Sequence, residues 1–265
     1  FNTIEFDHAL DADIEKRVKR TGHDGRLLTR ADGSVVHATL VEKLLILLLA
    51  KLSNYIPGAG IWMNTQRPEW NDANNALVGR GVSVVTLGYL RRFTAFLLKL
   101  LPATEGESFA VESSLATFFG KTEDILTRHE PQEASLDPQA RRRVMDELGR
   151  AGSAYRTGYY QNGLSSTRIS LTHTRLDTFL KRTLAWMDEG LRVNRREDGL
   201  YHAYNTLTLG PQATEITRLK EMLEGQVSII SSGSLSHEEV LATLQALRRS
   251  ALYREDQHSY MLYPN

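Results

Sequence analysis

Apolar positions at helical spacing dominate the chain from residue 41 onward. The stretches at 41–56 and 82–101 are apolar on most sides, a pattern typical of helices that protein surrounds completely. The stretches at 135–160, 175–193 and 236–253 each have one charged face, which should contact water. The pattern therefore predicts inner helices flanked by amphipathic outer helices.

Start signals support two of the amphipathic helices. Asp137 stands before a proline that suits a first helical turn, and Ser236 begins a capping box. The chain offers about seven strong helix candidates, whereas a closed toroid of six helical hairpins needs about twelve helices. We therefore expect an all-α fold of stacked helical hairpins that does not close into a ring.

Strand signals are few in this sequence. Residues 24–40 can form a hairpin around 31–33, and residues 226–230 can be a strand or the start of a helix. No internal repeat, low-complexity tract or linker divides the chain. The expectation is a single helical domain over residues 1–265.

Charge and composition exclude several classes of partner. The 32 basic residues balance the 32 acidic ones, which favours a neutral or mildly polar ligand over nucleic acid or an anionic membrane. Cysteine is absent, and the eight histidines lack a recurrent ligand spacing, so we expect no metal site. The longest apolar run, at 44–50, is far shorter than the roughly 20 residues of a membrane span. A cytoplasmic protein is the default expectation.

The stretch IWMNTQRPEWNDANNALVGRG, at residues 61–81, carries the residues best suited to bind a sugar. The indole rings of Trp62 and Trp70 can stack on the apolar face of a pyranose. The side chains of Asn71, Asn74 and Asn75 can exchange hydrogen bonds with sugar hydroxyls. By default, however, tryptophans are core residues.

Asp72 is the candidate acid of this stretch. Its neighbours Trp70 and the asparagines can desolvate it, and Glu69 lies three positions earlier, on the same face if the segment is helical. Both effects raise the pKa of a carboxyl, as protonation of a glycosidic oxygen requires. The alternative is that Asp72 caps a helix over 73–78, and spacing alone favours the cap.

A second aromatic stretch lies at 155–164. Tyr159 and Tyr160 can line a sugar cleft there, although tyrosines at helical spacing are more often packing groups.

The stretch at 68–90 resembles the catalytic-acid segment of the inverting glycoside phosphorylases of the cellobiose and chitobiose phosphorylase group. The triplet Trp70-Asn71-Asp72 matches the centre of that motif, Val78 and Gly79 match its next pair, and Gly81, Ser83 and Val84 match the start of the following helix. The resemblance continues more weakly through 155–164 and 227–264. It implies an (α/α)6 catalytic barrel in the six-hairpin glycosidase-like group, with Asp72 as the general acid and inorganic phosphate as co-substrate in place of a cofactor.

The same resemblance implies that part of the barrel lies elsewhere. Glu69 stands where the motif usually has aspartate, and Ala73 replaces a glycine. The family's upstream Arg-Asp segment and its downstream Gly-Gly-rich phosphate-binding segment have no counterpart in this chain. We therefore expect that a further polypeptide segment completes the barrel, or that the chain is a relative with altered or lost activity.

The sequence thus predicts a carbohydrate-active enzyme that cleaves a β-linked glucan or oligosaccharide with inversion, by phosphorolysis. One alternative is an inverting glycoside hydrolase, for which Glu255 or Asp256 would serve as the base. The other is a non-catalytic carbohydrate-binding or scaffolding module.

Overall fold

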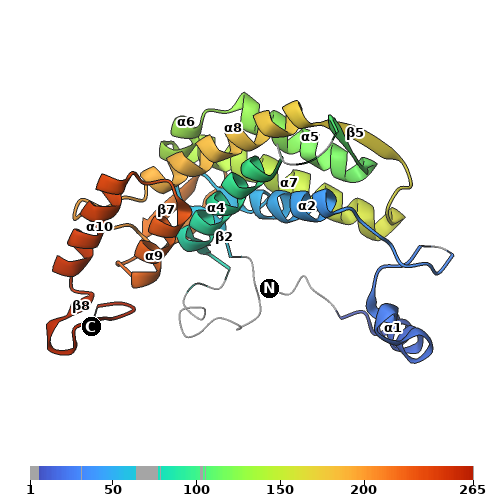
Figure 1. Ribbon diagram of the computed structural model, residues 1–265, viewed down its shortest axis with the longest axis horizontal. Coiled ribbons are helices and arrows are strands. Elements are labelled where there is room, and N and C mark those ends of the chain that lie inside the picture. Colours follow the sequence, from blue (N-terminus) through green and yellow to red (C-terminus); the bar gives the residue numbers. More distant parts are fainter. Residues whose placement is uncertain are drawn as a thin grey trace.

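The computed structural model describes residues 6–30, 32–63, 77, 79–101, 104 and 106–264. Five long helices enclose the main hydrophobic core (Figure 1). They are α2 (Leu40–Leu52), α4 (Val84–Leu100), α5 (Ser113–Arg128), α7 (Pro138–Asn162) and α8 (His173–Arg192).

Large apolar side chains fill this core and are tied to the backbone. Trp186 of α8 is 1% exposed, and its indole nitrogen donates to the Leu126 carbonyl at 3.0 Å. Tyr55 donates to the Trp186 carbonyl at 2.8 Å, while Phe119 and Phe179 contact each other with ring centroids 4.6 Å apart. The predicted inner stretches at 41–56 and 82–101 indeed supply α2 and α4 to this core.

A five-stranded antiparallel sheet accompanies the helices, so the all-α prediction, and with it the (α/α)6 toroid of helical hairpins, is wrong. The structure is 60% helical with 15% strand. The strand order is β1-β2-β3-β6-β7, with Ile61 opposite Ser83 and Gly81 opposite Thr206. The strands are β1 (Tyr55–Ile56), β2 (Gly60–Trp62), β3 (Gly81–Ser83), β6 (Tyr204–Leu209) and β7 (Thr214–Arg218).

The length of the first three strands explains the error. Strands of two or three residues are too short for an alternation of apolar and polar positions to be recognised. They are also buried on both faces, so their apolar residues resemble continuations of α2 and α4. β6 and β7 are longer, and their several threonines and an isoleucine give them a composition that favours strands.

Two smaller antiparallel pairs and several short helices complete the fold. β4 (Ser108–Glu112) pairs with β5 (Arg168–Thr172), and β8 (Tyr253–Arg254) pairs with β9 (Ser259–Tyr260). The helical elements are α1 (His8–Thr21), η1 (Gly22–Arg26), α6 (Pro131–Leu136), α9 (Leu223–Ser232), α10 (His237–Arg249) and η3 (Glu255–Gln257). Figure 1 shows α1 apart from the helical body, and α1 buries none of its residues.

Several local predictions are confirmed. Asp137 caps α7 by accepting hydrogen bonds from two backbone amides, and Ser236 forms a complete capping box at α10. Residues 226–230 lie in a helix, α9, which settles that alternative. The hairpin predicted over 24–40 is reduced to a single antiparallel bridge between Thr29 and Val35. None of the described helices is long and apolar enough to cross a membrane.

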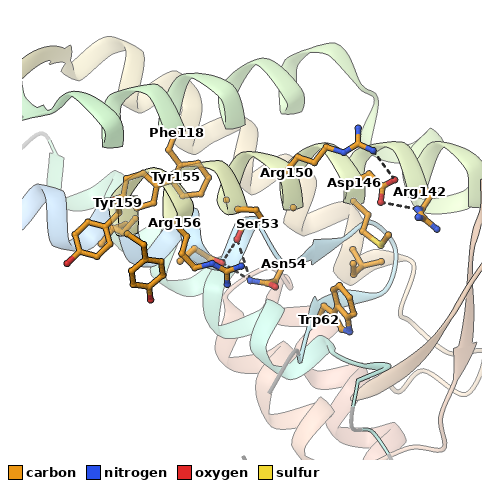
Figure 2. A pocket seen from close by; sticks show the side chains of 18 residues that line it. Ser53, Asn54, Trp62, Phe118, Arg142, Asp146, Arg150, Tyr155, Arg156 and Tyr159 are labelled. Carbon is orange, nitrogen blue, oxygen red and sulfur yellow. Dashed lines mark hydrogen bonds and ion pairs between the residues drawn. The ribbon is translucent and has the colours of Figure 1, made fainter. Parts of the chain in front are cut away.

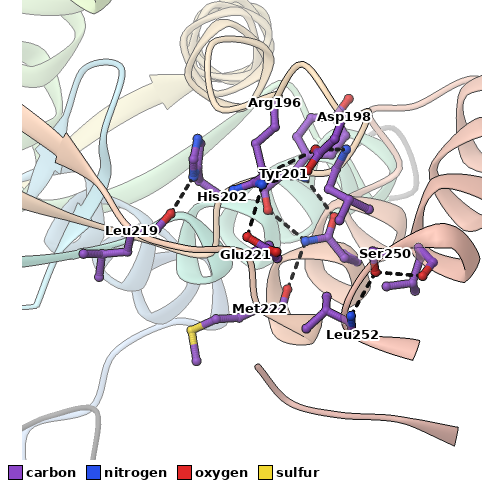
Figure 3. Close-up of polar contacts among 12 residues, drawn as sticks. Arg196, Asp198, Tyr201, His202, Leu219, Glu221, Met222, Ser250 and Leu252 are labelled. Carbon is purple, nitrogen blue, oxygen red and sulfur yellow. Dashed lines mark hydrogen bonds and ion pairs between the residues drawn. The ribbon is translucent and has the colours of Figure 1, made fainter. Parts of the chain in front are cut away.

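Polar contacts hold α9 against the loop before β6 (Figure 3). The buried amide of Gln226 accepts from the Tyr201 nitrogen at 2.9 Å and donates to the Tyr201 carbonyl at 2.8 Å. In the same region Arg196 forms ion pairs with Asp198 at 2.7 Å and with Glu221 at 3.1 Å. These contacts join α9, which packs against α4, to the loop that leads into β6.

Candidate functional site

A groove of about 710 Å³ runs along one face of α7 and is the candidate functional site (Figure 2). Its α7 side is a stripe of residues spaced three or four apart, as one helix face requires. The opposite wall comes from the end of α2 and the β1–β2 region. We call it the α7 groove. Its α7 stripe comprises Arg142, Met145, Asp146, Gly149, Arg150, Gly152, Ser153, Tyr155, Arg156, Tyr159 and Tyr160.

Small residues in the middle of the stripe let the two walls approach closely. A Cβ added at Gly152 would lie 2.5 Å from the Cβ of Ser53, so only glycine fits there. Ser53 and Asn54 follow α2, and both side chains hydrogen-bond to the Ala50 carbonyl, at 2.8 and 3.0 Å. Ser53 and Asn54 therefore place short polar side chains on the wall opposite the α7 stripe, among apolar residues such as Ile46 and Ile56.

Tyrosines form one end of the α7 groove. The rings of Tyr159 and Tyr160 lie 5.5 Å apart at an interplanar angle of 55°, and Tyr160 is 76% exposed. Tyr155 stacks on Phe118 with centroids 5.1 Å apart, which fixes its ring against the core. Burial, and then the neighbouring Tyr160, raise the pKa of Tyr159, so its hydroxyl stays protonated and can donate a hydrogen bond.

Trp62 lies toward the other end of the α7 groove. Its ring packs against the small apolar cluster that includes Val82 and Met145, and its indole nitrogen donates to the Gly79 carbonyl at 3.1 Å. The amide of Met63 donates to the Gly81 carbonyl at 2.9 Å. The backbone on either side of residues 64–78 is thus joined beside Trp62.

The structure brings together three of the predicted sugar-binding residues, because Trp62, Tyr159 and Tyr160 all line the α7 groove. The other predicted site residues lie outside the described residues, so the roles assigned to them stay predictions. They are Glu69, Trp70, Asn71, Asp72, Asn74 and Asn75.

Sequence reasoning missed the charged residues of the α7 groove. Asp146 accepts from the Arg142 guanidinium at 2.9 Å and lies 3.8 Å from that of Arg150. Arg156 lines the same groove one turn before the tyrosines. Arg142, Asp146, Arg150 and Arg156 share a helical spacing with Tyr159. This spacing is visible in the sequence and would have identified them as residues of the same helix face.

A second groove of about 530 Å³ adjoins the first, and Ile46 and Tyr155 line both. It holds two carboxylates from the buried residues Glu42 and Glu112, a combination that resembles an acid–base pair. The hydrogen-bond partners of the two carboxylates argue against a role as an acid–base pair.

Backbone amides satisfy both buried carboxylates. Glu42 accepts from the amides of Thr39 and Glu112, at 2.7 and 2.8 Å, and pairs with Arg168. Glu112 accepts from the amides of Leu115 and Ser165. Burial raises the pKa of each carboxyl, but these hydrogen bonds together outweigh it, and both pKa values are lowered. Both groups are therefore ionised and structural, and neither can donate a proton as a general acid.

Glu255 and Asp256, the bases considered for a hydrolase, lie in η3 near the end of the chain and do not line the α7 groove. Asp256 pairs with Arg254 at 2.7 Å, and this hydrogen bond lowers its pKa. No group of three potential metal ligands occurs among the residues that the structure describes.

No model of a known protein family and no curated protein sequence matches the chain.

Proposed function

We propose that the α7 groove binds an oligosaccharide. The observation that supports this proposal is the convergence of Trp62, Tyr159 and Tyr160 on one elongated groove, whose opposite wall carries the polar side chains of Ser53 and Asn54. Eighteen residues separate Arg142 from Tyr160, which corresponds to about 27 Å along a helix and is long enough for several sugar rings. Aromatic rings suit the apolar faces of such rings, while Ser53 and Asn54 suit their hydroxyls.

The proposal extends to an enzyme that cleaves a β-linked glucan or oligosaccharide with inversion. Asp72 belongs to residues 64–78, and the backbone on both sides of that segment is joined beside Trp62, next to the groove. As general acid, Asp72 would protonate the leaving glycosidic oxygen while phosphate attacks the opposite face of the anomeric carbon. The proton released by the attacking hydrogen phosphate returns to Asp72, and a sugar phosphate of inverted configuration leaves.

A binding module without catalysis is the second candidate. Asp146 is the one carboxylate among the described residues that line the α7 groove, and the guanidinium of Arg142 already binds it at 2.9 Å. If Asp72 does not serve the groove, binding is the only activity that the described residues support.

Sugar binding is tested with cellotetraose and laminaritetraose by isothermal titration calorimetry. Replacing Tyr160→Ala should weaken binding about two- to tenfold, because an exposed stacking ring is removed without disturbing the core. Tyr263→Ala is the matched control, since Tyr263 is 58% exposed and lies outside the groove. Absence of binding to both sugars, or equal losses in the two variants, would refute the proposed groove.

Catalysis is tested by incubating the same oligosaccharides with and without inorganic phosphate. Phosphate-dependent release of a sugar phosphate supports phosphorolysis, phosphate-independent cleavage supports the hydrolase, and binding alone supports the module. Asp72→Asn should lower turnover about 10²- to 10⁴-fold and leave the fold intact. Normal turnover in that variant would exclude Asp72 as the acid.

A further inference from the structure

The α7 groove carries an excess of positive charge although the whole chain is neutral. The charged residues among its described lining are Arg142, Asp146, Arg150 and Arg156, three cations against one anion. All four lie on the α7 stripe, so they share one face of the groove (Figure 2). The ligand of this groove therefore meets a local field that the overall composition does not reveal.

One of the three arginines is already neutralised. Arg142 donates to Asp146 at 2.9 Å and to the Gly210 carbonyl at 2.5 Å, so its guanidinium is held in place. Arg150 is only loosely associated, because its nitrogen lies 3.8 Å from Asp146 and its side chain is 80% exposed. Asp146 therefore neutralises Arg142, and the guanidinium of Arg150 is left with most of its hydrogen-bonding capacity.

Arg156 is the more informative of the two remaining cations. It forms no hydrogen bond or ion pair with any residue that the structure describes, yet it lines the groove between Ser53 and Tyr159 (Figure 2). A guanidinium presents several donors in a planar fork that matches an anionic group with two or three oxygens. The guanidinium of Arg156 thus lies near Tyr159 and Tyr160, whose rings are proposed to stack on a sugar.

We propose that the oligosaccharide bound in the α7 groove is anionic, and that Arg156 binds the carboxylate or sulfate group of one sugar residue. This inference rests on the proposed binding of an oligosaccharide and specifies its chemical class. Arg150 contacts a second anionic group on the same ligand. Six residues separate the two arginines, which corresponds to about 9 Å along the helix, so they serve different sugar residues.

The test compares three forms of each tetrasaccharide by calorimetry: neutral cellotetraose and laminaritetraose, their C6-oxidised uronate forms and their 6-O-sulfated forms. The protein should bind the uronate or the sulfate form at least about threefold more tightly than the neutral form, and the difference should shrink as salt is added. Whether uronate or sulfate is preferred distinguishes the two sources of the anionic group.

Arg156→Gln should reduce this preference, and Arg156→Gln combined with Arg150→Gln should abolish it. Arg249→Gln is the control, because Arg249 is an exposed arginine of α10 outside the groove and its replacement changes the net charge equally. Equal affinity of the protein for neutral and anionic forms would overturn this inference, and so would a preference that Arg156→Gln leaves undiminished. In either case, binding of the neutral sugar would still uphold the proposed function. Failure to bind any of the sugars would overturn both.

Discussion

Replacing Arg141→Met should destabilise the protein more than its position in a run of three arginines suggests. Arg141 is 5% exposed, and its guanidinium donates to the carbonyls of Pro57, Ser135 and Thr214 at 2.9, 2.5 and 2.8 Å. Burial lowers the pKa of Arg141 and the neighbouring Glu215 raises it, but an arginine remains protonated. One side chain thus joins α7 to α6, to the β1–β2 turn and to β7.

The size of the effect follows from the three carbonyls. Each is left without this donor in a buried position, at a cost of about 1 kcal/mol or more. Removing a cation from a desolvated site offsets part of that loss. We therefore expect the free energy of unfolding to fall by about 2–4 kcal/mol, which corresponds to a midpoint shift of about 1 M urea at a slope near 3 kcal/mol/M.

Urea unfolding followed by circular dichroism measures this shift. Arg143→Met is the matched control, because the side chain of Arg143 is 52% exposed and only approaches Glu133 at 3.5 Å. Its unfolding midpoint should change by less than about 0.2 M, as expected for a surface ion pair. A midpoint for Arg141→Met within that same margin would refute the assignment of three stabilising hydrogen bonds.

Further predictions concern helix packing and acid stability. Gly88→Ala should destabilise the protein by about 1–3 kcal/mol, because the added Cβ would lie 2.2 Å from the Ser228 hydroxyl. The Cβ added by Gly158→Ala meets nothing within 4 Å, so this change should stabilise the protein by up to about 1 kcal/mol. Thermal unfolding of the two variants measures the difference. The lowered pKa of Glu112 contributes stability that is present above roughly pH 4.5 and is lost as the pH falls through the pKa of Glu112 in the folded protein. Urea titrations at a series of pH values should therefore show a smaller loss of stability below roughly pH 4.5 for Glu112→Gln than for the unchanged protein. Gln226→Leu should lower the free energy of unfolding by about 2–4 kcal/mol, since the side-chain amide of Gln226 makes three hydrogen bonds to backbone groups, two of them buried. An unchanged denaturation midpoint would contradict the contacts of that amide.

The sequence predicted the helices better than the sheet because the two kinds of element leave different traces. Helices of thirteen residues or more, such as α2 and α4, repeat their apolar positions often enough to be recognised, and caps such as Asp137 mark their starts. The strands β1, β2 and β3 are two or three residues long, and β3 pairs with residues that are distant in the chain, as Gly81 with Thr206. Nothing local in two or three residues specifies such a partner.

The candidate site could be predicted only in part. The aromatic residues Trp62, Tyr159 and Tyr160 were recognised one by one from their chemistry, but their convergence depends on how α7 lies against the end of α2. Arg141 shows the converse error, since the charged face of the stretch at 135–160 was expected to contact water, whereas Arg141 within it is buried. A sequence pattern gives the face of a residue within its element, whereas burial depends on the neighbouring elements.

The length of α7 explains how one helix serves both the core and the groove. Its buried face contributes Val144 and Leu148 to the main core, and Arg141 ties its first turns to the sheet. Because these turns are fixed, the polar and aromatic stripe of α7 keeps its position opposite Ser53, which follows α2. Gly152 allows α7 and Ser53 to approach each other closely there. Filling that contact with a side chain would separate the two walls, so Gly152→Val should weaken oligosaccharide binding even though Gly152 has no side chain that binds the sugar. If affinity persisted in a folded Gly152→Val variant, the sugar would have to bind outside the α7 groove.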